Sequence, residues 1–190
     1  MTRQHFRWLG RAALGLVLCA SLSAQAQKVR VATSAGDIVI ELDAAKAPKT
    51  VDNFVSYVKA GHYNGTIFHR VIPTFMIQGG GMTADLKEKP TRAPIPLESR
   101  NGLSNVRGSV AMARTGNPNS ATAQFFINVK DNPRLDAANS PDGNGYAVFG
   151  KVISGMEVVD KIRDAPTGSM GPYDDVPNTP ITINKATLEK

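Results

Sequence analysis

The chain has 190 residues, 42% of them hydrophobic, and its 22 lysines and arginines against 16 aspartates and glutamates give a formal net charge of +6 at pH 7. The basic residues are scattered, and no run of them forms the charged stripe typical of a nucleic-acid-binding surface. No internal repeat or low-complexity tract interrupts the sequence, so we expect a single domain with one substantial core.

The first 26 residues have the pattern of a secretory signal peptide. Arg3, Arg7 and Arg11 give a positive start, residues 12–20 are an apolar run, and residues 24–26 offer an A-x-A cleavage site. The apolar run is too short to span a bilayer. We therefore expect residues 1–26 to be removed, which leaves no membrane attachment.

Cleavage after Ala26 leaves a domain of residues 27–190, with no cysteine and a net charge of +3. Such a chain has no disulfide, zinc-thiolate site or cysteine nucleophile, and it tolerates an oxidising compartment. Cys19 raises lipidation as an alternative, although Leu18 before it is larger than the residue that such sites prefer. We predict a periplasmic protein, with export to the medium as the other possibility.

The first elements of this domain are a hairpin and a helix. Strands are expected over residues 29–33 and 38–42, joined by a turn around Gly36. Pro48 is suited to the first position of a helix and Gly61 to the position just past its end. The expected apolar stripe of this helix consists of Val51, Phe54, Val55 and Val58.

Farther along, short strands alternate with loops, and a second helix is expected over residues 156–163, where Val158, Val159 and Ile162 recur at helical spacing. The other strands are expected over residues 67–70, 75–78, 95–97, 110–113, 124–129, 146–152 and 181–183. This pattern predicts a mainly β fold, a closed and mostly antiparallel barrel capped by two α-helices.

Two polar side chains stand out among the apolar residues 68–81. Phe68 and Arg70 are two apart, as are Met76 and Gln78, so each pair is expected to share one face of a strand. An arginine and an amide on an apolar face are costly unless something uses their hydrogen bonds. A salt-bridged structural arginine is the alternative. His69 alternates out of phase with its neighbours and is interpreted as structural.

Several sequence blocks together resemble the cyclophilin family of peptidyl-prolyl cis-trans isomerases. They read FHRVIPTFMIQGGG at residues 68–81, AQFFIN at 123–128, YAVFGKV at 146–152 and GMEVV at 155–159. The resemblance extends from Val29 to the C-terminus. It implies an eight-stranded barrel closed by a helix at each end, with a packed interior and an active groove on the outer surface.

The resemblance also implies the roles of individual residues. Arg70 matches the catalytic arginine. Gln78 matches the residue that hydrogen-bonds the substrate backbone and helps to orient Arg70. The pocket for the proline ring is expected from Phe75, Met76, Phe126 and Leu135, with Gln124 and Tyr146 beside the groove. Ala113 and Arg114 are expected at the edge where the main chain pairs with the peptide. Bond rotation needs no metal and no organic cofactor.

Three positions depart from the common family pattern. Arg134 stands where many eukaryotic members have a tryptophan that is important for binding cyclosporin, so weak inhibition by that drug is expected. Tyr146 stands at the position of the family's groove histidine, and Arg114 replaces a common asparagine. The loop over residues 136–145 also differs in length and sequence, which leaves the alignment there open by a residue or two.

Three functions are compatible with these features. The first is a prolyl isomerase that accelerates the folding of exported proteins, with proline-containing polypeptides as partners. The second is a proline-peptide binding module or chaperone with little turnover, and the third is a barrel that stores a small ligand. The presence of Arg70 and the pocket residues favours the first, and the bulky strand residues argue against the third. A monomer is expected.

Overall fold

The computed structural model of the protein describes residues 26–189. The predicted signal peptide therefore lies outside the described residues, except for Ala26. The elements are β1 (Lys28–Thr33), β2 (Gly36–Leu42), α1 (Pro48–Lys59), β3 (Thr66–Ile72), β4 (Met76–Gly79), β5 (Ser109–Met112), β6 (Phe125–Asn128), a 3₁₀ turn (Pro133–Leu135), β7 (Val148–Ser154), α2 (Met156–Arg163), β8 (Thr167–Met170), β9 (Tyr173–Pro177) and β10 (Thr182–Glu189).

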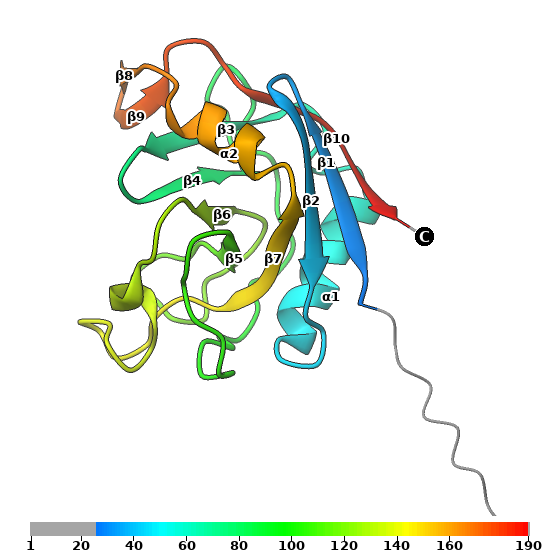
Figure 1. The fold of residues 1–190 in the computed structure, drawn as a ribbon, viewed down its shortest axis with the longest axis vertical. Helices are drawn as coiled ribbons and strands as arrows, with labels where there is room; N and C mark the ends of the chain where they lie inside the picture. Colours follow the sequence, from blue (N-terminus) through cyan, green and yellow to red (C-terminus); the bar gives the residue numbers. More distant parts are fainter. Residues whose placement is uncertain (1–25, 190) are drawn as a thin grey trace, which may run out of the picture.

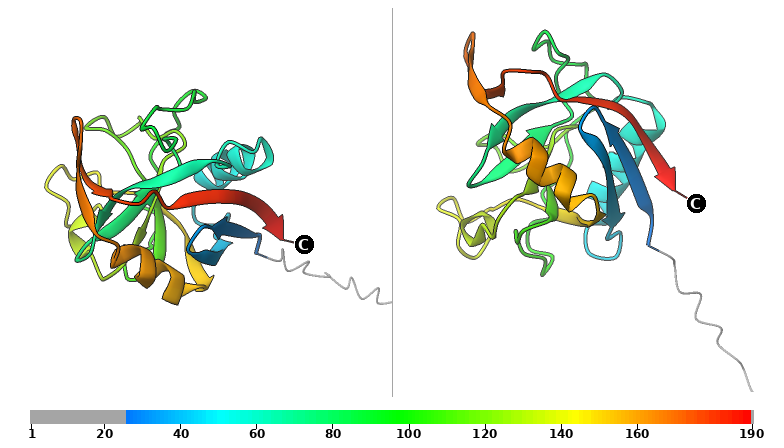
Figure 2. Two further views of the ribbon diagram at one scale, coloured as in Figure 1. Left: turned by 90° about the horizontal axis from the view of Figure 1, so that it is seen from above. Right: turned by 45° about the horizontal axis from the view of Figure 1, so that its top comes forward.

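Eight of the strands close into an antiparallel barrel in the order β1-β10-β3-β4-β6-β5-β7-β2. The two helices lie on opposite sides of it, as Figures 1 and 2 show. The predicted fold, a mainly β closed barrel with two helices, is confirmed. Closure pairs the first strand with the last, so that Lys28 lies opposite Glu189.

Local sequence signals fix the ends of α1 as predicted. Pro48 occupies the first turn, where a missing N–H costs no intrahelical bond. At the other end Gly61 has φ +66°, and the N–H groups of Gly61 and His62 donate to the carbonyls of Val58 and Tyr57. This is a Schellman cap, which glycine favours because it adopts a left-handed conformation without steric cost.

The interior of the barrel is packed with side chains from nearly every element. Phe54 of α1 contacts Phe125 and Phe149 at centroid distances of 5.5 and 5.0 Å, and all three side chains are buried. Alternation along the strands supplies this core; in β1, for example, Val29 and Val31 are buried whereas Arg30 is exposed. A filled interior contradicts the third alternative, a barrel that stores a ligand.

Two details of the strand prediction are wrong. Residues 95–97 form only one isolated bridge, Ile95 to Ala121, because Pro94 and Pro96 on either side lack the N–H that a strand ladder requires. The hairpin β8–β9 was not predicted, since its residues do not alternate between apolar and polar. It forms a separate two-stranded sheet beside the barrel.

Candidate active site

A β-bulge in β3 sets the direction of Arg70. Phe68 pairs with Gly79 and Arg70 pairs with Gln78, so His69 is an extra residue on the β3 side. Phe68 is fully buried in the barrel core, whereas the Arg70 side chain is 44% exposed on the outside. The prediction that Phe68 and Arg70 share a face is therefore wrong, because the bulge inserts one residue and changes the alternation.

The strand registers align a row of residues across the outer wall. Arg70 on β3 lies opposite Gln78 on β4, Gln78 opposite Phe126 on β6, and Phe126 opposite Ala111 on β5. Directly opposed residues of antiparallel strands have Cβ atoms roughly 4.5–5.5 Å apart. The row therefore runs from a charged group through an amide to an apolar surface over four strands.

The apolar end of this row belongs to a second hydrophobic cluster, which is separate from the barrel core and which we call the outer cluster. Alternation puts it there: Phe126 points outward, whereas Phe125 and Ile127 on either side belong to the core, and Met76 points outward beside the inward Ile77. The shared outward face of Met76 and Gln78 is thus confirmed. The outer cluster consists of Met76, Ala111, Phe126 and Val148, with Ile72, Phe75, Leu103, Ala113, Leu135 and Tyr146 packed against them.

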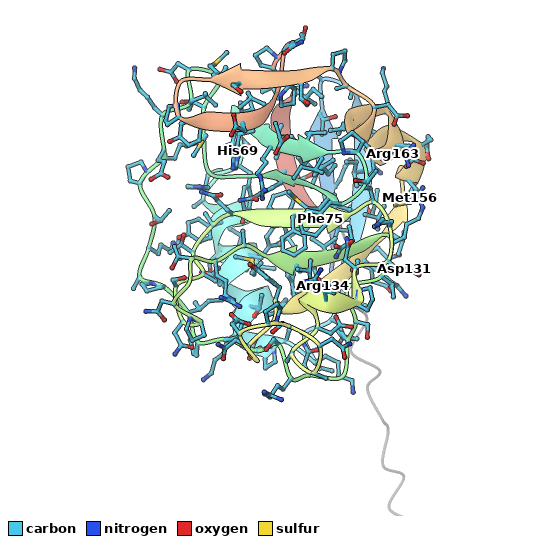
Figure 3. All side chains as sticks on the ribbon, turned by 90° about the vertical axis from the view of Figure 1, so that its left-hand side faces the viewer. His69, Phe75, Asp131, Arg134, Met156 and Arg163 are labelled. Atoms are coloured by element: carbon cyan, nitrogen blue, oxygen red, sulfur yellow. The ribbon has the colours of Figure 1, made fainter. Side chains whose placement is uncertain are left out.

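Six predicted site residues, far apart in the sequence, meet in the outer cluster. The rings of Phe126 and Tyr146 pack edge to face at a centroid distance of 5.6 Å. Beside them an open pocket of about 590 Å³ is lined in part by Phe75, Arg114, Leu135 and Tyr146. Figure 3 looks onto this side of the molecule, with Phe75 near the middle, His69 above it and Arg134 below.

The loop over residues 136–145 is closed at its base by main-chain bonding. Tyr146 donates its N–H to the carbonyl of Leu135 at 2.9 Å, which fixes the separation of these two pocket residues. Gly145, with φ +65°, makes the closure possible, because a Cβ at this position would overlap the backbone of Leu135 and Ala137. The main-chain bond therefore brings the two ends of the loop together at the pocket.

Gln78, which was expected to help orient Arg70, is hydrogen-bonded to Gln124 instead. Gln78 donates its amide to the side-chain oxygen of Gln124 at 2.9 Å, and among the described residues no hydrogen bond connects Gln78 to Arg70. The carbonyl of Gln124 accepts the N–H of Ala113 at 3.0 Å. The N–H of Ala113 is thus already used within the protein.

The side chain of Arg114 lies under the loop, and only 3% of it is exposed. It forms an ion pair with Asp142, donates through Nε to the carbonyl of Gly145 at 2.8 Å, and lies 4.5 Å from the ring centroid of Tyr146. A guanidinium over an aromatic face is attracted by the ring quadrupole. The side chain of Arg114 therefore holds Tyr146 and the loop in place.

His69 is 5% exposed, and its Nδ1 has no hydrogen-bond partner among residues 26–189. Burial, with a smaller contribution from the Arg70 charge, lowers its pKa from 6.5 to about 4. The ring is therefore neutral at physiological pH, in keeping with the structural interpretation. Within the same residues no group of three or more His, Cys, Asp or Glu could hold a metal ion, and no helix is both long and apolar enough to cross a membrane.

Sequence reasoning missed two residues that contact the site. Asn132 is buried and donates its amide to the carbonyl of Phe75 at 2.8 Å and to Asn128 at 2.7 Å. The sequence signal that could have indicated this role is Asn128 itself, a polar residue four positions earlier on the same strand-to-turn segment. Asp175 lies 3.8 Å from Arg70, between its Oδ2 and the arginine Nε. Nothing in the local sequence around Asp175 indicated this contact.

The molecule is thus a closed antiparallel barrel with a packed interior, with an apolar cluster on its outer wall and an exposed arginine in the same row of strands. A family model described as cyclophilin type peptidyl-prolyl cis-trans isomerase/CLD matches residues 28–188. The chain belongs to this family, and its activity is that of a peptidyl-prolyl cis-trans isomerase. Membership also decides between the first two alternatives in favour of the enzyme.

Individual relatives are bacterial isomerases. The chain is 58% identical over 161 residues to the peptidyl-prolyl cis-trans isomerase cyp18 of Streptomyces antibioticus, covering 84% of this chain and 97% of that protein. It is 53% identical over 159 residues to peptidyl-prolyl cis-trans isomerase B of Escherichia coli, covering 83% and 97%. The alignments thus span almost the whole of these relatives.

Solved structures support the same fold. A cyclophilin type isomerase from Cryptosporidium parvum superimposes with a TM-score of 0.71 at 29% sequence identity, covering 87% of this chain and 98% of that one. A further crystal structure of that protein was obtained in the presence of the dipeptide Ala-Pro, and it matches with the same TM-score. The barrel described above is therefore the cyclophilin barrel.

Proposed function

We propose that this enzyme accelerates rotation about Xaa-Pro bonds in exported proteins, with Arg70 as the catalytic residue. The row Arg70–Gln78–Phe126–Ala111 carries this proposal, because it places a permanent positive charge one strand away from an apolar surface on the outer wall of the barrel. We place the substrate's proline ring on Phe75, Met76, Phe126 and Leu135, and its main chain along Gln78, Gln124 and the Ala113–Arg114 edge beside Tyr146. The Ala-Pro dipeptide named for the Cryptosporidium parvum structure supports a substrate of this kind.

The chemistry fits a site without a nucleophile. Amide resonance sets a rotation barrier of roughly 18–20 kcal/mol, and catalysis requires tighter binding of the twisted state than of either planar state. In the twisted state the prolyl nitrogen becomes pyramidal and regains a lone pair. The guanidinium of Arg70 stays charged and can donate a hydrogen bond that the planar amide accepts poorly.

Arg70 does not account for the whole effect. A charge-assisted hydrogen bond contributes roughly 1.5–3 kcal/mol, whereas a rate gain of about 10⁵ requires about 7 kcal/mol. The rest comes from the outer cluster, which holds the proline ring while the preceding carbonyl rotates, and from preorganised polar groups in a groove with little water. Both the charge and the apolar pocket are therefore needed.

The cellular setting completes the proposal. Residues 1–26 direct export and are removed, and residues 27–190 act in the periplasm as a monomer on unfolded or partly folded chains, whose uncatalysed prolyl isomerisation takes roughly 10–100 s. Expression of the full chain in a bacterium, fractionation and N-terminal sequencing test this. A mature protein that begins at Gln27 in the periplasmic fraction supports the proposal, and an unprocessed cytoplasmic protein contradicts it.

The catalytic assignment is tested by NMR measurement of cis-trans exchange in a short Xaa-Pro peptide. We expect strong acceleration by residues 27–190 and a loss of at least about a hundredfold on Arg70→Ala, roughly 2.7 kcal/mol. Arg30→Ala is the matched control, because Arg30 is also an exposed arginine paired with carboxylates but lies on β1, which β10 separates from β3, outside the row Arg70–Gln78–Phe126–Ala111. An Arg70→Ala enzyme as active as the wild type would overturn the assignment.

Arg134, which replaces the tryptophan of many eukaryotic members, is expected to affect inhibition by cyclosporin. This residue is exposed and lines the pocket beside Leu135, where a tryptophan would add apolar contact. We propose that cyclosporin binds weakly and that Arg134→Trp strengthens binding. Titration of both proteins with the drug tests this, and equal affinities would contradict it.

A further inference from the structure

The hairpin β8–β9 brings a carboxylate to Arg70. β9 packs against β3 outside the barrel, which Figure 1 shows at the upper left and Figure 3 at the top, above the strand that carries His69. Asp175 of β9 approaches Arg70 to 3.8 Å, measured from Oδ2 to Nε. Among residues 26–189, the side chain of Arg70 makes no other ion pair and no side-chain hydrogen bond.

The backbone of β9 is shaped so that this contact can form. Gly168 pairs with Val176 and Met170 with Tyr173, so Asp174 and Asp175 together oppose the single residue Ser169 in a β-bulge. Asp175 has φ +61°, a left-handed conformation that few residues other than glycine, asparagine and aspartate adopt readily. Bulges of this kind change the direction of a side chain, and here the affected side chain contacts Arg70.

The rest of the hairpin is anchored independently of that contact. Val176 and Pro177 are buried, and Asp174 accepts a hydrogen bond from Ser169 at 2.6 Å. The two adjacent carboxylates therefore have different partners, one within the hairpin and one on Arg70. This difference provides a matched pair of positions for mutagenesis.

We infer that Asp175 is a positioning residue for Arg70, an inference that rests on the proposed catalytic function of Arg70. The carboxylate attracts the guanidinium on its Nε side, and the two terminal amino groups remain available to the substrate. A flexible arginine side chain loses much rotamer freedom when it is fixed. Asp175 restrains the Arg70 side chain before rotation begins. Less rotamer entropy is therefore lost when Arg70 binds the twisted state.

The expected effect of removing the Asp175 charge is modest, because both side chains of the ion pair are partly exposed to solvent. The side chains of Arg70 and Asp175 are 44% and 41% exposed, so water and salt weaken their attraction. We expect Asp175→Asn to lower kcat about threefold with little change in KM. The split is expected because substrate affinity comes mainly from the outer cluster, whereas the orientation of Arg70 matters in the transition state.

Asparagine is the appropriate substitution because it tolerates the left-handed backbone of Asp175 and removes only the charge. Exchange rates measured over a range of peptide concentrations give kcat and KM for the wild type, Asp175→Asn and Asp174→Asn. We expect the loss for Asp175→Asn alone at low ionic strength, and we expect it to shrink in 1 M NaCl, where the Debye length is about 3 Å. An equal loss in both variants, or a loss independent of salt, would overturn the inference.

A double-mutant cycle tests whether Asp175 acts through Arg70. In an Arg70→Ala background, Asp175→Asn is expected to have no further effect on the residual rate. The Nε–H NMR signal of Arg70 should also shift on Asp175→Asn and stay in place on Asp174→Asn. If Arg70→Ala abolishes catalysis but Asp175→Asn leaves kcat and this signal unchanged, the inference fails and the proposed function stands. If Arg70→Ala is fully active, the proposed function itself fails.

Discussion

Gln78 and Gln124 are joined side chain to side chain, the amide of Gln78 donating to the amide oxygen of Gln124 at 2.9 Å. Gln78 also lies directly opposite Arg70 in the β3–β4 ladder, and the main chain of Gln124 holds Ala113. One hydrogen bond therefore connects the charged end of the site to the edge where a peptide would pair. Its geometry depends on the close approach of Gly81 to Gln124.

The first prediction concerns Gly81→Ala. A Cβ at Gly81 would overlap the side chain of Gln124, although the backbone conformation of Gly81 is open to alanine. The displaced Gln124 would release Gln78, and the loss of one hydrogen bond worth about 1 kcal/mol should lower kcat/KM about fivefold. Gly116→Ala, which adds a methyl group in open space, is the control. Unaltered kcat/KM for Gly81→Ala would show that this bond does not support activity.

The second prediction concerns Asn132, which supports the pocket from behind. Its amide donates to the carbonyl of Phe75 and to Asn128, and both Asn132 and Asn128 are buried. Asn132→Ala removes the donor to the side chain of buried Asn128 and one of two donors to the carbonyl of Phe75, which also accepts the N–H of Val129. The free energy of unfolding should fall by about 1–3 kcal/mol, and KM should rise because Phe75 is held by one hydrogen bond fewer.

Urea unfolding and peptide titration check the effect of Asn132→Ala, with Asn139→Ala as the control. Asn139 donates a comparable bond, to the carbonyl of Pro133, but it is exposed, so its loss should be nearly neutral. Equal stability losses in the two variants would contradict the explanation based on burial.

The third prediction is a pH dependence of stability that arises from His69. Burial lowers the pKa of this histidine to about 4 in the folded protein, whereas it is about 6.5 in the unfolded chain. Between these values the unfolded state binds the additional proton, so stability falls as the pH decreases from 6.5 to 4. From pH 7 to pH 5 the loss should be about 2 kcal/mol.

Urea unfolding at several pH values measures this effect in the wild type and in His69→Leu, and the difference between the two slopes isolates His69. NMR titration of the ring proton should find His69 still neutral at pH 5. A midpoint near 6.5 in the folded protein would contradict the prediction.

The fourth prediction concerns the loop that carries Asp142. Hydrogen bonds from Ser140, from the main chain of Asn144 and from Arg114 hold the pKa of Asp142 well below its usual range. A depressed folded pKa means that the stabilisation is present above the unfolded value of about 3.9 and is lost only as the pH falls through the lower folded value. The carboxyl carbon of Asp142 should therefore show no titration midpoint between pH 7 and pH 3.

Removal of the Arg114 guanidinium, one of these hydrogen-bond donors, should raise the pKa of Asp142. In Arg114→Met the carboxyl should titrate at a higher pH than in the wild type, and the main-chain signals of residues 140–145 should lose protection from hydrogen exchange. Arg100→Met is a suitable control, because Arg100 contacts the same loop only through the carbonyl of Gly143. Identical titration curves for the wild type and Arg114→Met would show that Arg114 does not lower the pKa of Asp142.

Alternation and cap residues made much of the fold predictable. The boundaries of α2, the glycine cap of α1 and the outward direction of Met76 with Gln78 follow from patterns that extend over only a few residues. The meeting of Phe75, Phe126, Leu135 and Tyr146 was predicted only through the family resemblance, because no local pattern indicates which loops lie side by side. The bulge in β3 and the hairpin β8–β9 were not predicted either, because each depends on a strand register that interrupts the simple alternation of side chains.

By itself the sequence determined the membership of the chain in the cyclophilin family and its mainly β barrel. Only the tertiary structure decided that Arg70 points outward from a bulge beside Phe68, that Arg114 is buried beneath Tyr146, and that Asp175 reaches Arg70. The physical reason is that periodicity and capping are local. The bulge instead depends on how β3 pairs with β4, and the ion pair depends on the packing of β9 against β3, about a hundred residues earlier in the chain.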